Sequence, residues 1–116
     1  MHIPIIYKGE IIMIEFANYE HYDELLSEGF VIVDFFTETC GPCKILARYL
    51  EEITYELPFV NIVKVNCTTY PKLGVDNEIE AVPTILFVKD GKILERVVGL
   101  IDQDEITEKI SEYYYG

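Results

Sequence analysis

Tryptophan is absent from this chain of 116 residues, and basic residues are scarce. Nine Lys and Arg oppose 21 Asp and Glu, which gives a net charge of −12. Because such a charge repels phosphate backbones and anionic lipids, we expect neither nucleic acids nor membrane surfaces as partners. No apolar run reaches the roughly 20 residues that a membrane-spanning helix needs. The first ten residues lack a basic leader, so neither a signal peptide nor a membrane anchor is expected.

Cysteine is also rare, because the chain has only Cys40, Cys43 and Cys67. This small, odd number excludes a secreted scaffold held by disulfides and favours a reducing compartment, so the expected location is cytoplasmic. Half of the residues are hydrophobic, including six Phe and nine Tyr. With them the chain can bury a core, and we expect a single domain over residues 1–116, with residues 1–10 as an extension of uncertain structure.

Two of the cysteines form a Cys-Gly-Pro-Cys motif at residues 40–43, between an apolar run at residues 31–36 and a helical segment. The spacing indicates thiol chemistry, but it also occurs in zinc sites, structural disulfides and iron–sulfur centres. A zinc site would need two further ligands, and neither Cys67 nor either histidine shows the pairing of metal ligands. We therefore expect no metal and no other cofactor.

Hydrophobic periodicity predicts an alternation of strands and helices. Strands are expected over residues 11–16, 30–36, 60–65, 85–88 and 93–98, and helices over residues 18–29, 43–57, 71–79 and 102–113. The apolar run at residues 3–7 could form a hairpin with the first strand or lead loosely into it, and we favour a single strand. Strand, helix and strand in succession imply a parallel crossover between residues 30–36 and 60–65.

Residues typical of caps and turns mark several boundaries. Asn18 stands where an N-cap is expected and Gly29 where a C-cap is expected. Asp102 is the expected N-cap of the last helix, and Glu105 follows at the spacing of a capping box. Lys-Asp-Gly-Lys at residues 89–92 predicts a hairpin between the last two strands.

One carboxylate, Asp34, interrupts the apolar run of residues 30–36, which has the pattern of a strand buried on both faces. An unpaired buried charge is costly, so this side chain is either hydrogen-bonded at the end of the strand or functional. The next central strand carries a single cation, Lys64. That lysine either neighbours Asp34 or extends along the edge of the sheet to water.

Taken in order, these residues resemble the thioredoxin family. The matching features are Val33-Asp34-Phe35-Phe36 before Cys-Gly-Pro-Cys, Lys64, Val82-Pro83-Thr84, the Lys-Asp-Gly-Lys turn and Gly99. The resemblance covers about residues 11–114 and implies the thioredoxin fold, an α/β fold with a central mixed β-sheet and helices on both faces. Members of the family usually carry Trp before the first cysteine, where this chain has Thr39.

The resemblance implies a thiol-disulfide oxidoreductase that reduces protein disulfides. Cys40, at the N-terminus of a helix, would be stabilised as a thiolate by backbone N–H groups and the helix dipole. It would form a mixed disulfide with the target, and Cys43 would resolve it. The implied partners are disulfide-containing proteins and a thioredoxin reductase or similar electron donor, and we expect a monomer.

The resemblance also implies roles for residues outside the motif. It places Asp34 beneath Cys43, where burial would raise the pKa of the carboxyl group and let it accept the Cys43 proton. It implies a cis bond between Val82 and Pro83, which would pack against the cysteines and expose the Val82 backbone for strand-like pairing with a substrate.

The same resemblance assigns a docking surface to Thr39, Gly41, Pro42 and Gly99, beside Val82. Gly41 allows a partner chain to approach closely, and Pro42 suits an early helix position because it lacks a backbone donor. Alternatives to the reductase are a thiol oxidase or isomerase, and a binding module that uses this surface for a dedicated partner. The third cysteine, Cys67, is interpreted as a small buried hydrophobe, with a regulatory disulfide as the alternative.

Overall fold

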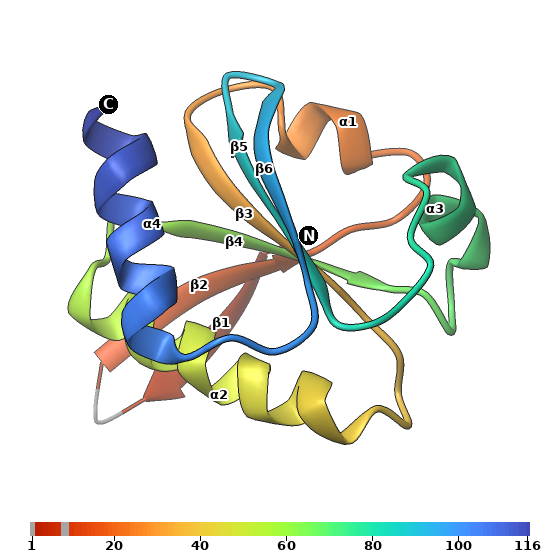
Figure 1. Ribbon diagram of the computed structural model, residues 1–116, viewed down its shortest axis with the longest axis horizontal. Helices are drawn as coiled ribbons and strands as arrows, with labels where there is room; N and C mark the ends of the chain where they lie inside the picture. Colours follow the sequence, from red (N-terminus) through yellow and green to blue (C-terminus); the bar gives the residue numbers. More distant parts are fainter. Residues whose placement is uncertain (1, 8–9) are drawn as a thin grey trace.

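The computed structural model describes the backbone of residues 2–7 and 10–116 and the side chains of residues 14–116, and it is built around one six-stranded sheet (Figure 1). The strands are β1 His2–Tyr7, β2 Glu10–Phe16, β3 Phe30–Phe36, β4 Asn61–Asn66, β5 Thr84–Lys89 and β6 Lys92–Val98. The helices are α1 Tyr22–Leu25, α2 Gly41–Glu56, α3 Pro71–Asp76 and α4 Gln103–Tyr115.

Both parallel and antiparallel pairs occur in the sheet, whose order is β1-β2-β4-β3-β5-β6. β2 and β3 each pair with β4 in parallel, so the predicted parallel crossover between β3 and β4 is confirmed. β1 with β2, β3 with β5, and β5 with β6 are antiparallel. The expected mixed sheet is therefore present, and its central strand β3 leads directly to the cysteine motif.

Helices cover both faces of the sheet, with α2 and α4 on one face and α1 and α3 on the other (Figure 1). On the first face, Ile32 of β3 and Ile62 of β4 pack with Leu50 of α2. On the second face, the neighbouring residues Val33 and Val63 pack in a separate cluster. Side chains alternate along a strand, so β3 and β4 contribute to both layers and are buried on both faces, as predicted.

The N-terminal run departs from the favoured interpretation. Residues 2–7 form β1, which pairs antiparallel with β2 in a register from His2 opposite Glu15 to Tyr7 opposite Glu10. The favoured single strand was therefore wrong, and the hairpin-like alternative holds. β1 occupies the outer side of β2, where the backbone N–H and C=O groups of β2 would otherwise lie at a sheet edge.

The first helix is also shorter than predicted, because α1 has only four residues, Tyr22–Leu25, and its N-cap is His21. Asn18 Oδ1 accepts the N–H groups of Glu20 and His21 at 3.1 and 2.9 Å, so Asn18 caps a turn that precedes the helix. Gly29, with φ of +75°, turns the chain into β3 rather than ending α1 directly. A turn capped by Asn and the first turn of a helix have similar sequences. The predicted helix therefore included the turn that precedes α1.

The last helix begins as predicted but without the predicted capping box. Asp102 is the N-cap of α4, yet its side chain makes no capping hydrogen bond. The first intrahelical bond instead runs from the Ile106 N–H to the Asp102 carbonyl at 3.1 Å. Asp104 and Glu105 lie in the first turn of α4. Their negative charges interact favourably with the positive N-terminal end of the helix dipole.

None of the helices in the described part of the chain is both long enough and apolar enough to cross a membrane.

Candidate active site

The motif of residues 40–43 lies where the chain leaves β3 and enters α2. Cys40 is the N-cap of α2, and its Sγ accepts a hydrogen bond from the Cys43 N–H at 3.1 Å. Cys40 and Cys43 form a disulfide, with their Cα atoms 5.3 Å apart. Pro42 lies in the first helical turn, where the lack of an N–H costs no hydrogen bond. The Cys40 sulfur is thus at the positive end of the helix, which stabilises a thiolate there in the reduced protein.

The two sulfurs differ in accessibility. Cys40 is half-buried, whereas Cys43 is only 3% exposed. Thr39, Gly41 and Pro42 surround Cys40 and are exposed. A Cβ added at Gly41 would meet no atom within 4 Å, so the space in front of the motif is open. A partner disulfide can approach Cys40 from this side, while Cys43 lies behind it.

Asp34 and Lys64 form a buried pair close to this motif. The two residues are opposite one another in the parallel register of β3 and β4, and Lys64 Nζ lies 3.6 Å from Asp34 Oδ2. That distance allows an ion pair but is too long for a good hydrogen bond. Asp34 is fully buried, and neither carboxylate oxygen has a hydrogen-bond partner among the described residues. Burial raises the Asp34 pKa to about 6, and the Lys64 charge limits the rise.

Strand alternation places this pair on the same face of the sheet as α2. Asp34 lies two residues after Ile32 and Lys64 two residues after Ile62, and both isoleucines belong to the cluster beneath α2. A pocket of about 140 Å³ then joins the pair to the motif, because Cys43 and Lys64 both line it. The register and the ion pair thus place Asp34 beside Lys64, and the pocket places Lys64 near Cys43.

Two segments far from the motif in sequence lie near it in space. The segment at Val82 lies beside Cys40, and the segment at Gly99 is bonded to Pro83. The Val82–Pro83 bond is cis, and the Val82 carbonyl oxygen lies 3.9 Å from Cys40 Sγ. The Gly99 N–H donates to the Pro83 carbonyl at 2.8 Å. Gly99 has φ of +93°, a conformation that favours glycine. The structure therefore brings Val82, Pro83 and Gly99 together beside Cys40.

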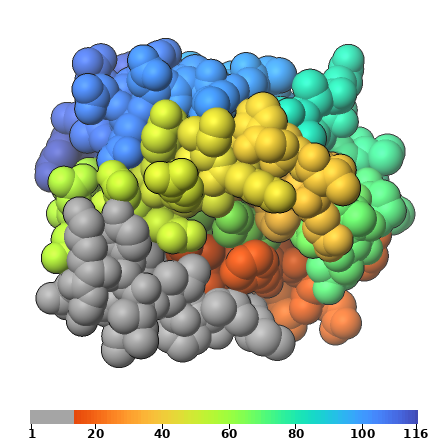
Figure 2. Space-filling model, turned by 90° about the horizontal axis from the view of Figure 1, so that it is seen from below, coloured from red at the N-terminus to blue at the C-terminus, as the bar shows by residue number. Residues whose placement is uncertain are grey.

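A second pocket, of about 270 Å³, extends from Val82 away from the motif. It is lined by Thr37, Cys67, Pro71, Gly74, Val75, Ile79, Glu80, Ala81 and Val82. Figure 2 shows the start of α2 in gold beside the teal segment near residue 80 and the green segment that follows β4. This pocket was not predicted from the sequence. Val75, an exposed apolar residue on the short helix α3, is part of its lining.

Cys67 is half-buried at the wall of this second pocket. Its sulfur occupies the space beside Gly74, where an added Cβ would lie 3.2 Å from it. Burial, and then the negative charge of Asp34, raise the pKa of the Cys67 thiol. This thiol therefore forms a thiolate less readily than an ordinary cysteine.

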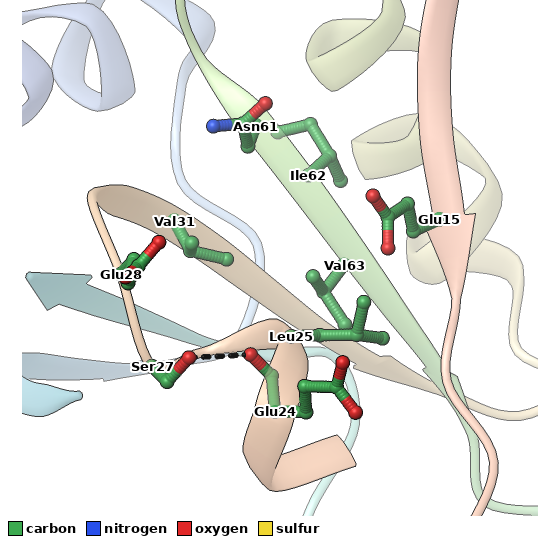
Figure 3. A pocket seen from close by; sticks show the side chains of 9 residues that line it. All are labelled: Glu15, Glu24, Leu25, Ser27, Glu28, Val31, Asn61, Ile62 and Val63. Carbon is green, nitrogen blue, oxygen red and sulfur yellow. Dashed lines mark hydrogen bonds between the residues drawn. The ribbon is translucent and has the colours of Figure 1, made fainter. Parts of the chain in front are cut away.

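A larger pocket lies elsewhere, and none of the predicted site residues lines it. It has about 520 Å³ and is lined by Glu15, Glu24, Leu25, Ser27, Glu28, Val31, Asn61, Ile62 and Val63 (Figure 3). Val31 and Asn61 lie at the amino ends of β3 and β4, whereas the motif follows the carboxyl end of β3. Within the described part of the chain, no group of three His, Cys, Asp or Glu side chains is arranged to hold a metal ion.

Comparison with known proteins gives a consistent match. The Thioredoxin family model matches residues 12–112. The chain is 39% identical over 101 residues to a thioredoxin of Chlamydia trachomatis serovar D, covering 87% of this chain and 99% of the relative. It is 32% identical over 111 residues to thioredoxin H-type 2 of Nicotiana tabacum, covering 91% and 92% of the two chains.

Solved structures show the same architecture. Thioredoxin f2 of Chlamydomonas reinhardtii superposes with a TM-score of 0.78 at 26% identity, covering 86% of this chain and 95% of the other. Oxidised mitochondrial thioredoxin 3 of Saccharomyces cerevisiae superposes with a TM-score of 0.77 at 25% identity, covering 85% and 94%. The fold expected from the sequence is therefore confirmed.

Proposed function

The chain belongs to the thioredoxin family and is a thiol-disulfide oxidoreductase that reduces protein disulfides, and from this premise we propose the role of each site residue. Cys40 is the attacking cysteine and Cys43 the resolving one. The observation that carries this assignment is the asymmetry of the pair. Cys40 is half-buried and caps α2, while Cys43 is almost completely buried.

In the first step, the Cys40 thiolate attacks one sulfur of a substrate disulfide. A bond forms between Cys40 Sγ and that sulfur, and the substrate disulfide breaks. The other substrate sulfur leaves as a thiolate and takes up a proton from water. Backbone N–H groups at the start of α2, including that of Cys43, favour the ionised Cys40 before attack.

In the second step, Cys43 resolves the mixed disulfide. The Cys43 thiol gives its proton to Asp34, and its sulfur attacks Cys40 Sγ. The bond between Cys40 and the substrate breaks, and the substrate sulfur that was bonded to Cys40 leaves as a thiolate. The protein has then given two electrons to the substrate and holds the Cys40–Cys43 disulfide. A pKa of about 6 suits Asp34 to this exchange, because it is mostly ionised at neutral pH and still takes up a proton.

Substrate docking uses the surface around Cys40. The Val82 carbonyl close to Cys40 accepts a backbone N–H from an extended substrate segment, and Pro83 and Gly99 shape the same surface from below. Gly41 leaves room for the incoming chain, and Thr39 presents a small polar side chain there. This docking mode is supported by the position of the Val82 carbonyl beside Cys40 Sγ and by the bond that holds Gly99 to Pro83.

Members of the thioredoxin family reduce disulfide substrates and are themselves reduced by a thioredoxin reductase. We assign this chain disulfide-containing proteins as substrates and a thioredoxin reductase or similar donor as its source of electrons. We place it in the cytoplasm as a monomer of one domain. The acidic composition and the three cysteines support that location.

Reduction of a model disulfide protein such as insulin tests the assignment. With dithiothreitol as donor, the wild-type protein is expected to accelerate reduction. Cys40→Ser and Cys43→Ser are each expected to lower turnover to less than about one thousandth, because the two sulfurs act as one unit. Cys67→Ser, at the remaining cysteine, is the matched control and should leave turnover unchanged.

The outcomes separate this function from its alternatives. No acceleration by the wild-type protein would contradict the reductase assignment and favour a binding module. Full turnover by Cys43→Ser would instead overturn the resolving role of Cys43. Addition of a thioredoxin reductase and NADPH in place of dithiothreitol then tests the donor by itself.

A further inference from the structure

The loop that carries Cys40 is held by Glu38, a residue that the mechanism above does not use. The Glu38 N–H donates to Thr68 Oγ1 at 3.1 Å, and Glu38 Oε2 accepts from Asn66 Nδ2 at 2.8 Å. Asn66 is the last residue of β4, and Thr68 lies in the turn that follows. Glu38 is thus bonded through both its backbone and its side chain to the end of the strand that carries Lys64.

The turn to which Glu38 is bonded is itself well fixed. Asn66 Oδ1 accepts the Thr68 N–H at 2.9 Å, and the Cys67 N–H donates to the Phe36 carbonyl at 2.8 Å. These bonds tie the ends of β3 and β4 together immediately before the motif. The position of Cys40, two residues after Glu38, therefore depends on this network.

Glu38 also lines the small pocket beside the resolving cysteine. Seven described residues line the pocket of about 140 Å³ beside Cys43, and Glu38 is the one acid among them. Two cations line the same pocket, Lys44 from α2 and Lys64 from β4. Asp34 acts from β3 through its ion pair with Lys64. By Coulomb's law the two lysines favour a thiolate at Cys43, and Glu38 opposes it.

We propose that Glu38 is a positioning residue for thiol–disulfide exchange, which holds the Cys40 loop through its two hydrogen bonds and sets the pH range of the resolving step through its charge. This inference rests on the roles proposed above for Cys40 and Cys43. Glu38 touches neither substrate nor reacting sulfur in this scheme, because it acts through the loop and through its field.

Three substitutions separate the two effects. Thr68→Val removes the acceptor for the Glu38 N–H and keeps the charge. Glu38→Gln removes the charge but keeps a side-chain oxygen for Asn66. Glu38→Ala removes both the charge and the side-chain bond. Thr68→Ser, which keeps the hydroxyl, is the matched control.

The measurement is the rate at which Cys43 resolves the mixed disulfide, followed by rapid quench in a single turnover of the reduced protein with a model protein disulfide. This rate is recorded across the pH range together with the melting temperature. Thr68→Val should lower the rate about threefold at every pH, the effect of losing one modest hydrogen bond. Glu38→Gln should keep the plateau rate and move the midpoint of the pH profile to lower pH, because a negative charge that opposes the Cys43 thiolate is gone. Glu38→Ala should show both changes, and Thr68→Ser neither.

The possible failures are distinguishable. If the wild-type protein does not reduce the model disulfide, the proposed function fails. If the wild-type protein is active and Glu38→Ala matches it in rate and pH profile, only the role of Glu38 is overturned. A fall in rate that merely follows a lower melting temperature, with an unmoved pH profile in Glu38→Gln, would also overturn it, because Glu38 would then only support the fold.

Discussion

Two acid–lysine pairs lie in different regions of this molecule and are built in opposite ways. Beneath the motif, Asp34 faces Lys64 at 3.6 Å, and its fully buried carboxylate accepts no hydrogen bond from the described residues. Between β6 and α4, Lys109 Nζ donates to Glu95 Oε2 at 2.8 Å, and the Tyr113 hydroxyl donates to the other Glu95 oxygen. The second pair is partly exposed and well bonded.

The two carboxylates respond with opposite shifts. Burial raises the Asp34 pKa to about 6, whereas hydrogen bonds from Lys109 and Tyr113 lower the Glu95 pKa. A carboxylate that is poorly bonded keeps its proton exchangeable near neutral pH, and one that is fully bonded stays charged. We propose that the first pair serves proton transfer at a cost in stability, whereas the second pair bonds α4 to β6.

The largest expected effect is on stability, from Asp34→Asn. Because the folded pKa of Asp34, about 6, exceeds its ordinary value of 3.8, ionised Asp34 opposes folding, and Asp34→Asn should raise the free energy of unfolding at pH 8 by roughly 3 kcal/mol. The advantage should shrink as the pH falls through 6 and be smallest below about pH 4, where the carboxyl group is protonated in both states. Denaturant unfolding at several pH values measures this, and an advantage that grows with falling pH would contradict it.

The same substitution should lower activity. The amide side chain of Asp34→Asn cannot accept the Cys43 proton. We therefore expect turnover at pH 7 to fall about 100-fold, the lower end of the contribution of a general base. The loss should be in release of the substrate from the mixed disulfide rather than in the first attack. Rapid-quench analysis of the two steps checks this, and an equal slowing of both steps would show that Asp34 does not act at Cys43.

A smaller effect is expected from Lys64→Met, which removes the charge and keeps the apolar stem. Since Lys64 lowers the pKa of Asp34 against the effect of burial, its loss should move the Asp34 titration upward by about one pH unit. NMR of the Asp34 carboxyl carbon follows this titration. Lys109→Met, in the second pair, is the matched control, and a similar shift from that variant would mean that the two pairs are not independent.

The smallest effect should come from Glu95→Gln. This partly exposed pair is expected to contribute about 0.5 to 1 kcal/mol to the free energy of unfolding at pH 7. Because the folded pKa of Glu95 is lowered, that contribution is present above the ordinary pKa and is lost as the pH falls through the folded value. Unfolding curves at pH 7 and pH 3 test it. Turnover should not change, and a clear loss of turnover would give the second pair a role at the site.

Much of the fold could be predicted because its pattern is local. The apolar run of β3, the helical period of α2 and the Asp-Gly turn at residues 90–91 each specify one element. β1 was missed because a β-branched run does not reveal whether it pairs with its neighbour. The capping box of Asp102 and Glu105 was wrong because sequence spacing shows only that a side chain can reach the backbone, not that it bonds there.

The site was predictable where its chemistry depends on one segment. The spacing of Cys40 and Cys43 indicated thiol chemistry, and the charge of Asp34 within an apolar strand marked that residue as unusual. The roles proposed for these three residues came from the resemblance to the thioredoxin family. Glu38 was not singled out, because its importance comes from bonds to residues 66 and 68 across the sheet. The pocket beside Val82 was missed for the same reason, because its lining comes from three separate segments.

The assignment of Cys40 as the attacking cysteine is tested most directly by identifying the cysteine that bonds to the substrate. Reduced Cys43→Ser protein is mixed with a peptide that contains one disulfide, and the adduct is located by mass spectrometry after digestion. We expect one peptide half per protein chain, attached at Cys40, and no adduct in the Cys40→Ser protein. An adduct at Cys43 in Cys40→Ser protein, or at Cys67 in either variant, would contradict it.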